Sequence, residues 1–352
     1  MREKMNKVNI MIVLTIMMLI SNIMQSNSEG DLGKIRVATS LGILKSIVKR
    51  IGGDRVEVFS ILPSNVEPHQ FTLTPQIINQ VLNVDLIIID GHMEWEYKLI
   101  EQLAMHKDVN LENVVINLIE YKDNMTILDI PQEMGLSGKN YHGYWILPEN
   151  IMVIAEVICG KLSQIDPEGK SYYHENLKNL LEDVSKIKGL IEELKAKISG
   201  KNVVLGFLSE QYIAYLFNLK ITAILSLEEG VPPKPGSINR AYNALQSGGL
   251  IIISDISSKM PVYNAIIEIS KETGSPIIEV IMMRDMDYTL MMTYNIGKID
   301  GVLSITIIRD QQSEYGLNTI TITVIGMLAV VSTIEFLQIY KFRRKIYGYS
   351  KS

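Results

Sequence analysis

Short apolar segments alternate with amphipathic ones along residues 34–116 and again along residues 200–299, and no other feature constrains the fold of this chain as strongly. The segment at residues 85–89, DLIII, is apolar almost throughout, which is typical of a strand buried on both faces of a parallel sheet. Strands that alternate with helices predict parallel sheets with right-handed crossovers. The sequence therefore predicts an α/β protein with two (β/α) lobes and mostly parallel sheets.

The same periodicity locates the individual elements. In the first lobe it predicts strands at residues 34–39, 56–62, 85–89 and 114–116, with helices at residues 41–51, 74–81 and 94–106. In the second lobe it predicts strands at residues 201–207, 221–225, 250–254 and 276–281, with helices at residues 210–217, 238–246, 258–273 and 288–299.

One long amphipathic segment separates the two stretches. After Asp166, apolar residues recur every three or four positions as far as Ile198, which predicts a helix of ~45 Å at ~1.5 Å per residue. Such a helix either bridges two lobes or forms a coiled coil, and its single apolar stripe favours packing along both lobes. The predicted domains are an N-terminal lobe at residues 34–166, a rigid connecting helix at 167–199 and a C-terminal lobe at 200–308.

The N-terminal end has the pattern of a secretory signal peptide. Basic residues Arg2, Lys4 and Lys7 precede an apolar run at residues 8–20 and a polar segment at 21–30. The cleavage motif is poor, so residues 1–30 are predicted to be either a signal peptide or an N-terminal anchor.

The C-terminal end is predicted to cross the membrane. Residues 318–340 contain a mostly apolar run of about 20 residues, which is the length that spans a bilayer. Four basic residues lie directly after it, so the positive-inside rule makes residues 341–352 a basic cytoplasmic tail. We therefore predict a single-pass protein of the cell membrane whose main body is extracytoplasmic. The alternative is a buried helix in a soluble domain.

Composition narrows the classes of function. The net charge is −5 and the body has no basic block, which argues against a nucleic-acid partner. The single cysteine, Cys159, excludes an internal disulfide and is interpreted as a buried thiol on a helix face. No Gly-x-Ser-x-Gly, phosphate-binding glycine loop or His-Glu-x-x-His motif is present, so the chain is predicted not to be an enzyme.

His69 lies in a turn with a proline on either side, directly after the predicted strand at residues 56–62. Proline fixes φ and restricts the residue before it, so Pro68 and Pro75 predict a stiff loop at a strand end. An imidazole held on such a loop is a candidate ligand.

Several segments in order resemble the metal-specific solute-binding proteins of ABC importers, the zinc and manganese class. The matching segments are VATSLGILKSIVKRIGGDRVEV, LPSNVEPHQFTLTP, VDLIIIDGHMEWE, LEEGVPPKP and YTLMMTYNIGKI, and the resemblance covers about residues 34–305. It implies two lobes joined by a long rigid helix and a divalent metal ion, manganese or zinc, as the transported ligand between them. It also implies an ABC permease and its ATPase as partners. The C-terminal helix predicted from the apolar run would hold the protein at the membrane near that permease.

The resemblance implies two imidazole ligands from the N-terminal half. His69 matches the histidine of the Pro-His-x-Phe-x-Pro-Thr-Pro motif of the family, and His142 matches the histidine of its second motif. The second match is imperfect, because one residue is inserted before Trp145 and Leu147 stands where the family has Asp.

The ligands implied for the C-terminal half are altered. The third family position aligns with Phe207 and the fourth with Ile281 or nearby, and neither side chain binds metal. Glu210 and Asp285 are the predicted replacements. With two imidazoles they make a site for manganese or zinc, in which imidazole suits zinc and the carboxylates favour the harder ion.

The remaining candidate residues have simpler interpretations. His92, at a predicted strand end, is interpreted as lining the cleft or as supporting a helix start or a ligand. His106 and His174 are interpreted as exposed, and four methionines are assigned to the core: Met282, Met283, Met291 and Met292.

The sequence thus predicts an extracytoplasmic, membrane-anchored solute-binding protein that captures manganese or zinc and delivers it to an ABC permease. One alternative is a protein of the same fold that no longer binds metal and acts as an adhesin or accessory subunit. A second is a metal-dependent hydrolase that uses His69 and His142 with a bound water, which would need a third ligand and a general base in the same lobe.

Overall fold

The computed structural model describes residues 33–63, 66, 68–106, 110–131, 137–227, 231–246 and 248–315, with side chains as far as residue 304. The chain divides into two compact units, residues 1–296 and 297–352. The first unit holds both lobes. In the second, the described residues continue helix α11.

The N-terminal lobe is built on a parallel sheet of four strands in the order β2-β1-β3-β4. The strands are β1 (Ile35–Thr39), β2 (Val56–Ser60), β3 (Leu86–Ile89) and β4 (Val115–Asn117). The helices are α2 (Gly42–Gly52), α3 (Pro75–Val81), α4 (Glu94–His106), α5 (Leu111–Val114) and α6 (Pro148–Ile165). Every residue of β3 is buried, as its apolar run predicted.

The C-terminal lobe repeats this topology with the strand order β6-β5-β7-β8. The strands are β5 (Asn202–Phe207), β6 (Lys220–Ser226), β7 (Leu250–Ser254) and β8 (Ile277–Val280). The helices are α8 (Gln211–Leu216), α9 (Pro235–Leu245), α10 (Val262–Thr273) and α11 (Tyr288–Tyr315). The prediction of two α/β lobes with parallel sheets is confirmed.

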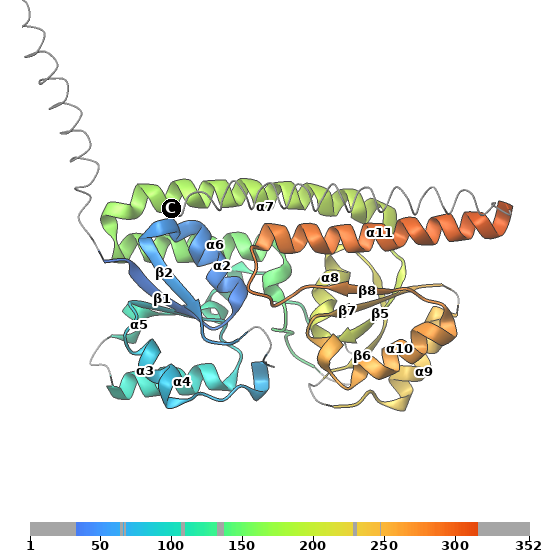
Figure 1. Cartoon of the computed structure of the whole chain (residues 1–352), viewed down its shortest axis with the longest axis horizontal. Helices are drawn as coiled ribbons and strands as arrows, with labels where there is room; N and C mark the ends of the chain where they lie inside the picture. The colour runs from blue at the N-terminus through green and yellow to red at the C-terminus, as the bar shows by residue number, and fades with distance from the viewer. Residues whose placement is uncertain are drawn as a thin grey trace, which may run out of the picture. The chain divides into compact units, whose positions relative to one another are not determined.

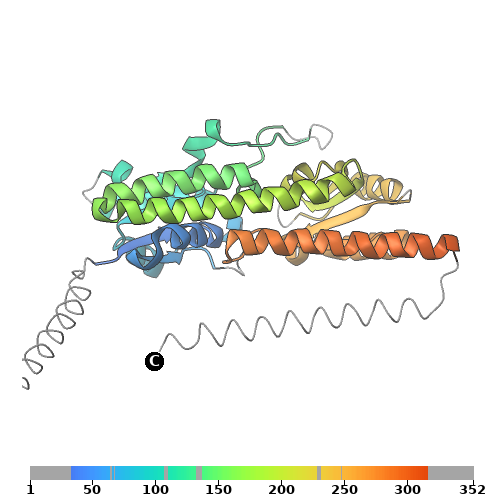
Figure 2. The same cartoon turned by 90° about the horizontal axis from the view of Figure 1, so that it is seen from above.

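Helix α7 (Lys170–Ile198) runs along both lobes, as two views of the molecule show (Figure 1, Figure 2). Near its start, Asn176 Nδ2 donates to the carbonyl of Ile51 in α2, at 2.9 Å. Near its end, Ile191 faces a groove that Ala214 and Ile221 of the C-terminal lobe also line. Its apolar stripe therefore packs against both lobes.

The predicted fold class is wrong on one point, the transmembrane helix at residues 318–340. No helix in the described part of the chain is long and apolar enough to cross a bilayer. The last described helix, α11, carries Lys298 and Asp300, and the interior of a bilayer disfavours such charges. Residues 318–340 lie outside the described residues, as do the predicted signal segment at 1–30 and the tail at 341–352.

Candidate metal centre

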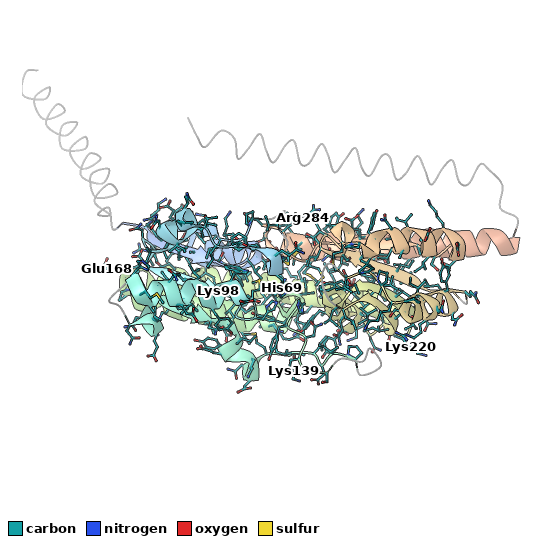
Figure 3. All side chains as sticks on the ribbon, turned by 90° about the horizontal axis from the view of Figure 1, so that it is seen from below. His69, Lys98, Lys139, Glu168, Lys220 and Arg284 are labelled. Atoms are coloured by element: carbon teal, nitrogen blue, oxygen red, sulfur yellow. The ribbon has the colours of Figure 1, made fainter. Side chains whose placement is uncertain are left out.

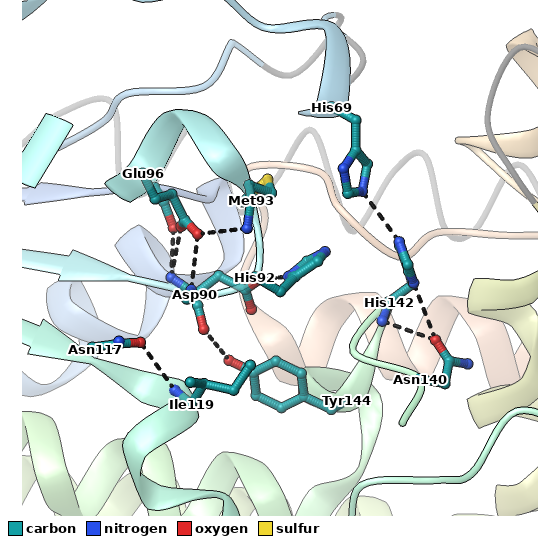
Figure 4. Close-up of polar contacts among 12 residues, drawn as sticks. His69, Asp90, His92, Met93, Glu96, Asn117, Ile119, Asn140, His142 and Tyr144 are labelled. Atoms are coloured by element: carbon teal, nitrogen blue, oxygen red, sulfur yellow. Dashed lines mark hydrogen bonds and ion pairs between the residues drawn. The ribbon is translucent and has the colours of Figure 1, made fainter. Parts of the chain in front are cut away.

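Three imidazoles meet where the two lobes face each other. One ring nitrogen from each of His69, His92 and His142 lies within 4.8 Å of the other two. Figure 3 labels His69 at this boundary, and Figure 4 shows the cluster in detail. The Nε2 atoms of His69 and His142 are 3.1 Å apart. Two nitrogens bound to one tetrahedral zinc at ~2.0–2.1 Å would lie ~3.3 Å apart, so this pair already has nearly the spacing that a shared ion requires.

His69 lies in a short 3-10 turn, Pro68–Gln70, between β2 and α3. Pro68 is buried and so anchors the turn, whereas His69 is exposed. After the turn, Thr74 caps α3 by accepting a hydrogen bond from the backbone of Ile77, with Pro75 at the first helical position. The structure thus places His69 in a turn between a strand and a helix, with Pro75 at the start of the helix.

His92 follows the carboxyl end of β3 through a tight turn at Gly91. Gly91 has φ +95°, and a Cβ there would lie 2.0 Å from Oδ1 of Asn117. Only glycine fits this turn, because the left-handed conformation strains other residues and the neighbouring amide fills the space. The turn brings His92 Nδ1 onto the carboxylate of Asp90 (Figure 4).

The Asp90 contact sets the state of His92. Burial works to lower the pKa of His92, but the charge and hydrogen bond of Asp90, with the charge of Glu96, raise it overall. A carboxylate on one ring nitrogen fixes the orientation of an imidazole and leaves the other nitrogen for a metal. Oδ1 of Asp90 is buried and has no hydrogen-bond partner among the described residues.

Glu96 in α4 holds the turn that carries His92. Its two carboxylate oxygens accept hydrogen bonds from the backbone amides of Asp90, Gly91 and Met93, at 2.8, 2.9 and 3.1 Å. Burial, followed by the charge of Asp90, raises the pKa of Glu96 to about 7. The strand, the turn and the start of α4 are therefore joined by one buried side chain.

His142 lies on a loop that is bonded to the C-terminal lobe. Its backbone amide donates to Oδ1 of Asn140 at 2.9 Å, and its Nδ1 lies 3.3 Å from the same oxygen. Asn140 Nδ2 in turn donates to the carbonyl of Leu208 at 3.0 Å. Burial, with the charges of His92 and His69, lowers the pKa of His142 to about 3, so its imidazole is neutral and free to bind a cation.

The cavity beside the imidazoles is small and almost closed. Its volume open to water is about 10 Å³, about the space of one water molecule. Besides the histidines, the N-terminal half contributes Leu41, Pro68, Met93 and Trp145, and the C-terminal lobe contributes Phe207, Ser209, Ile256 and Met283. Phe207, which aligns with the third family ligand, lies against His142 with a ring separation of 5.7 Å.

The structure does not bring Glu210 to the imidazoles. Glu210 is 0% exposed inside the C-terminal lobe. Its oxygens accept hydrogen bonds from the backbone amides of Phe207 and Ser254 and from Oγ of Ser257, which joins the ends of β5 and β7. Burial raises the pKa of Glu210 to about 7. Its carboxylate is engaged by these donors and lies outside the histidine cluster.

Asp285 also lies outside the cluster. It follows β8 and pairs with Lys45 of α2, with Nζ and Oδ2 2.6 Å apart. The backbone approaches closely here, because a Cβ at Gly42 would lie 2.9 Å from Cα of Asp285. Asp285 therefore forms a surface ion pair that links the two lobes.

His92 is the cluster member that the sequence analysis did not place among the ligands. A signal for it existed, because His92 comes three positions after the end of the strand predicted at residues 85–89, and the carboxyl ends of parallel strands share one edge of a sheet. His69 follows β2 at the same edge. The preceding Asp90 supplied the carboxylate that commonly accompanies a metal-binding histidine.

Comparisons with known proteins give a consistent result. The profile of the family described as "Zinc-uptake complex component A periplasmic" matches residues 37–302. The metal ABC transporter substrate-binding lipoprotein SsaB of Streptococcus sanguinis is 26% identical over 302 residues, which covers 78% of this chain and 91% of the relative. The manganese ABC transporter substrate-binding lipoprotein scaA of Streptococcus gordonii has the same identity and coverage. Among solved structures, the periplasmic zinc-binding protein TroA of Treponema pallidum aligns with a TM-score of 0.62 at 16% identity, over 76% of this chain and 98% of that one, and shows the same fold.

Proposed function

The chain belongs to the zinc-uptake complex component A family, and from this premise we propose that it binds a divalent metal ion through His69, His92 and His142 and passes it to the permease of an ABC importer. The observation that carries the proposal is the convergence of three ring nitrogens within 4.8 Å. Family membership agrees with the resemblance drawn from residues 34–305. The permease with its ATPase would be the partner, and the main body would be extracytoplasmic.

The donor set favours zinc over manganese. Imidazole nitrogen suits zinc, whereas manganese prefers carboxylate, carbonyl and water oxygens. The cluster contains three imidazoles and no carboxylate among the described residues. The carboxylates that would have favoured manganese, Glu210 and Asp285, are engaged elsewhere.

The placement of the ligands would tie the ion to both lobes. His69 and His92 are held by the N-terminal sheet, whereas the loop of His142 is bonded to the C-terminal lobe through Asn140. A bound ion would therefore favour one relative position of the lobes. A permease that recognises this position would distinguish the loaded protein from the empty one.

The hydrolase alternative gains a third ligand in His92, but the cavity that all three histidines line is small. It has a volume of about 10 Å³, about the space of one water, and the wider groove of about 580 Å³ beside it is lined by His69 alone of the three. Of the carboxylates nearest to His92, Glu96 accepts three backbone amides, and Asp90 contacts the His92 ring through Oδ2.

Metal analysis of the whole chain tests the proposal. Protein purified without chelator is expected to hold one equivalent of zinc, and competition titration is expected to show that His69→Ala, His92→Ala and His142→Ala each lower zinc affinity by more than ~100-fold. His106→Ala is the matched control, because His106 is exposed at the end of α4 and lies outside the cluster. Wild-type protein that neither holds zinc nor gains thermal stability from zinc or manganese would overturn the proposal.

A further inference from the structure

Ser209 has a buried hydroxyl with nothing to bond. The residue is 1% exposed, and its Oγ has no hydrogen-bond partner among the described residues. A hydroxyl offers one donor and two acceptor positions, and buried polar groups in folded proteins are normally paired. An unpaired hydroxyl beside a metal centre is therefore a candidate partner for a bound water or ligand.

Ser209 lies beside the three histidines of the candidate metal centre. Ser209 lines the same small cavity as the three histidines, and its backbone oxygen lies 3.2 Å from where a Cβ on Gly143, next to His142, would be. It belongs to the short 3-10 turn Leu208–Glu210 at the carboxyl end of β5. Glu210 fixes this turn by bonding to the backbone of Phe207 and Ser254, so Ser209 is held firmly against the site.

The coordination chemistry leaves one place to fill. Three imidazoles occupy three of the four positions of a tetrahedral zinc ion. The other residues that the C-terminal lobe presents to the cavity are Phe207, Ile256 and Met283, whose side chains have no hydroxyl, amide or charge. Among the described lining residues of that lobe, Ser209 alone has a side chain that can hydrogen-bond to a fourth ligand, and the cavity has room for one water.

We propose that Ser209 Oγ hydrogen-bonds to a water molecule that is the fourth ligand of the metal, and that it is the polar group through which the C-terminal lobe distinguishes the loaded site from the empty one. This inference rests on the proposed function. Buried without a partner, the hydroxyl disfavours the observed arrangement of the lobes. A metal-bound water would bond to the hydroxyl, so metal binding would favour this arrangement. Ser209 acts as a positioning residue and is not itself a metal ligand.

Two substitutions separate this role from its rival, a direct thioether ligand from Met283. Ser209→Ala is expected to lower zinc affinity by about 10-fold to 100-fold, the usual effect of losing a partner of a metal-bound group. Met283→Leu keeps the shape of the cavity and is expected to leave zinc affinity within about 3-fold, since a volume-conserving change of an apolar side chain is well tolerated. A larger loss of affinity in Met283→Leu than in Ser209→Ala would overturn the proposal.

The zinc-induced increase in melting temperature separates a role of Ser209 at the metal from a role in the fold alone. Without metal, Ser209→Ala is expected to melt at the wild-type temperature or above it, because the unpaired hydroxyl is gone. With zinc, the increase in the melting temperature of Ser209→Ala is expected to be smaller than that of wild type. Ser237→Ala is the control, a buried serine of α9 whose hydroxyl already accepts a bond from Arg240, and it should keep the full zinc-induced increase.

Zinc binding by wild type and by Ser209→Ala tests the proposed function and the role of Ser209 separately. Wild-type protein that binds no zinc would contradict the proposed function and this inference with it. Wild-type protein that binds zinc, together with Ser209→Ala binding it equally tightly and gaining the same stability, would contradict the role of Ser209 and leave the three-histidine site in place.

Discussion

Asp90 and Asn140 decide which nitrogen two of the imidazoles present to the cavity. Asp90 contacts Nδ1 of His92, and Oδ1 of Asn140 lies 3.3 Å from Nδ1 of His142. This orients each ring so that the other nitrogen, Nε2, is on the far side from these partners, and Nε2 of His142 lies 3.1 Å from Nε2 of His69. At the scale of single residues, the rings of His92 and His142 are therefore oriented by neighbours that are not themselves members of the cluster.

Replacing Asp90 tests this preparation. We expect Asp90→Asn to lower zinc affinity by about 10-fold to 100-fold, because His92 loses the carboxylate that orients it and raises its basicity. Competition with a chelator at neutral pH would measure the change. Asp85→Asn is a suitable control, since Asp85 is exposed at the other end of the same strand and bonds to the backbone of Arg36. Equal affinity in both variants would contradict the role of Asp90.

Glu210→Gln tests the ligand predicted from the sequence. The change leaves one backbone or hydroxyl donor without its acceptor, so we expect the free energy of unfolding to fall by about 1–3 kcal/mol. Zinc affinity is expected to change by less than ~10-fold, whereas loss of a true ligand would cost more than ~100-fold. Urea unfolding and zinc titration on one preparation would separate the two roles.

The pH dependence of Glu210 gives a further check. Burial raises its pKa from 4.5 in the unfolded chain to about 7 in the folded one, so the folded state holds this proton more tightly. The stability of the wild type relative to Glu210→Gln should therefore fall as the pH rises from about 4.5 to about 7 and stay level above that. A difference that did not vary with pH would show that the carboxylate titrates normally.

At the scale of elements, the start of α7 depends on Asp166. Its Oδ1 accepts from the backbone of Gly169 at 3.0 Å, and its Oδ2 accepts from Arg55 at 2.8 Å and from the hydroxyl of Tyr173 at 2.6 Å. The hydrogen bond from Arg55 is the largest cause that lowers the pKa of Asp166 to about 2. One carboxylate thus joins the N-terminal lobe to the first turn of the long helix.

Asp166→Asn should weaken this junction in a pH-dependent way. Because the folded pKa lies below the ordinary 3.8, the stabilisation is fully present above pH 3.8 and is lost as the pH falls through about 2. At neutral pH we expect the free energy of unfolding of Asp166→Asn to be lower than that of wild type by about 1 kcal/mol, allowing for screening by solvent. Urea unfolding at a series of pH values would measure it. Glu168→Gln, at an exposed position in the same turn, should have little effect at any pH.

Most elements follow from the periodicity of the sequence, because burial of an apolar face dominates local structure. The strand predicted at residues 85–89 is observed as Leu86–Ile89, and the one predicted at 201–207 as Asn202–Phe207. Helix α11 differs, since it continues past the predicted end at residue 299 to Tyr315. It passes through Gly297 and Gly301, residues that lower helix propensity but do not end a helix whose backbone bonds continue.

At the scale of the whole molecule, the lobes are joined by polar contacts around the site. Lys45 of α2 pairs with Asp285, and Arg50 lies 3.4 Å from Asp287. Trp145 Nε1 also donates to the carbonyl of Met282 at 2.8 Å. These bonds hold the loop of His142 and the helix α2 against the segment after β8.

Asp285→Asn tests whether this residue joins the lobes or binds the metal. A half-exposed ion pair contributes ~0–1 kcal/mol, so we expect a small fall in melting temperature and a change in zinc affinity of at most ~5-fold. Asp129→Asn, which removes a surface pair with Lys139, is the matched control. Loss of more than ~100-fold in affinity for the Asp285 variant alone would make Asp285 a ligand, as the sequence predicted.

The sequence by itself determined the two parallel α/β lobes, the long amphipathic helix and the turn that carries His69. These features depend on the spacing of apolar residues along the chain and on the fixed geometry of proline, both of which are local properties of the sequence. Only the tertiary structure decided the candidate ligand set. It brought His69 to His142, 73 positions away, added His92 at the shared edge of the sheet, and left Glu210 and Asp285 with other partners. A side chain binds a metal only if the groups around it in space leave it free to do so, and the packing of distant segments chooses those groups.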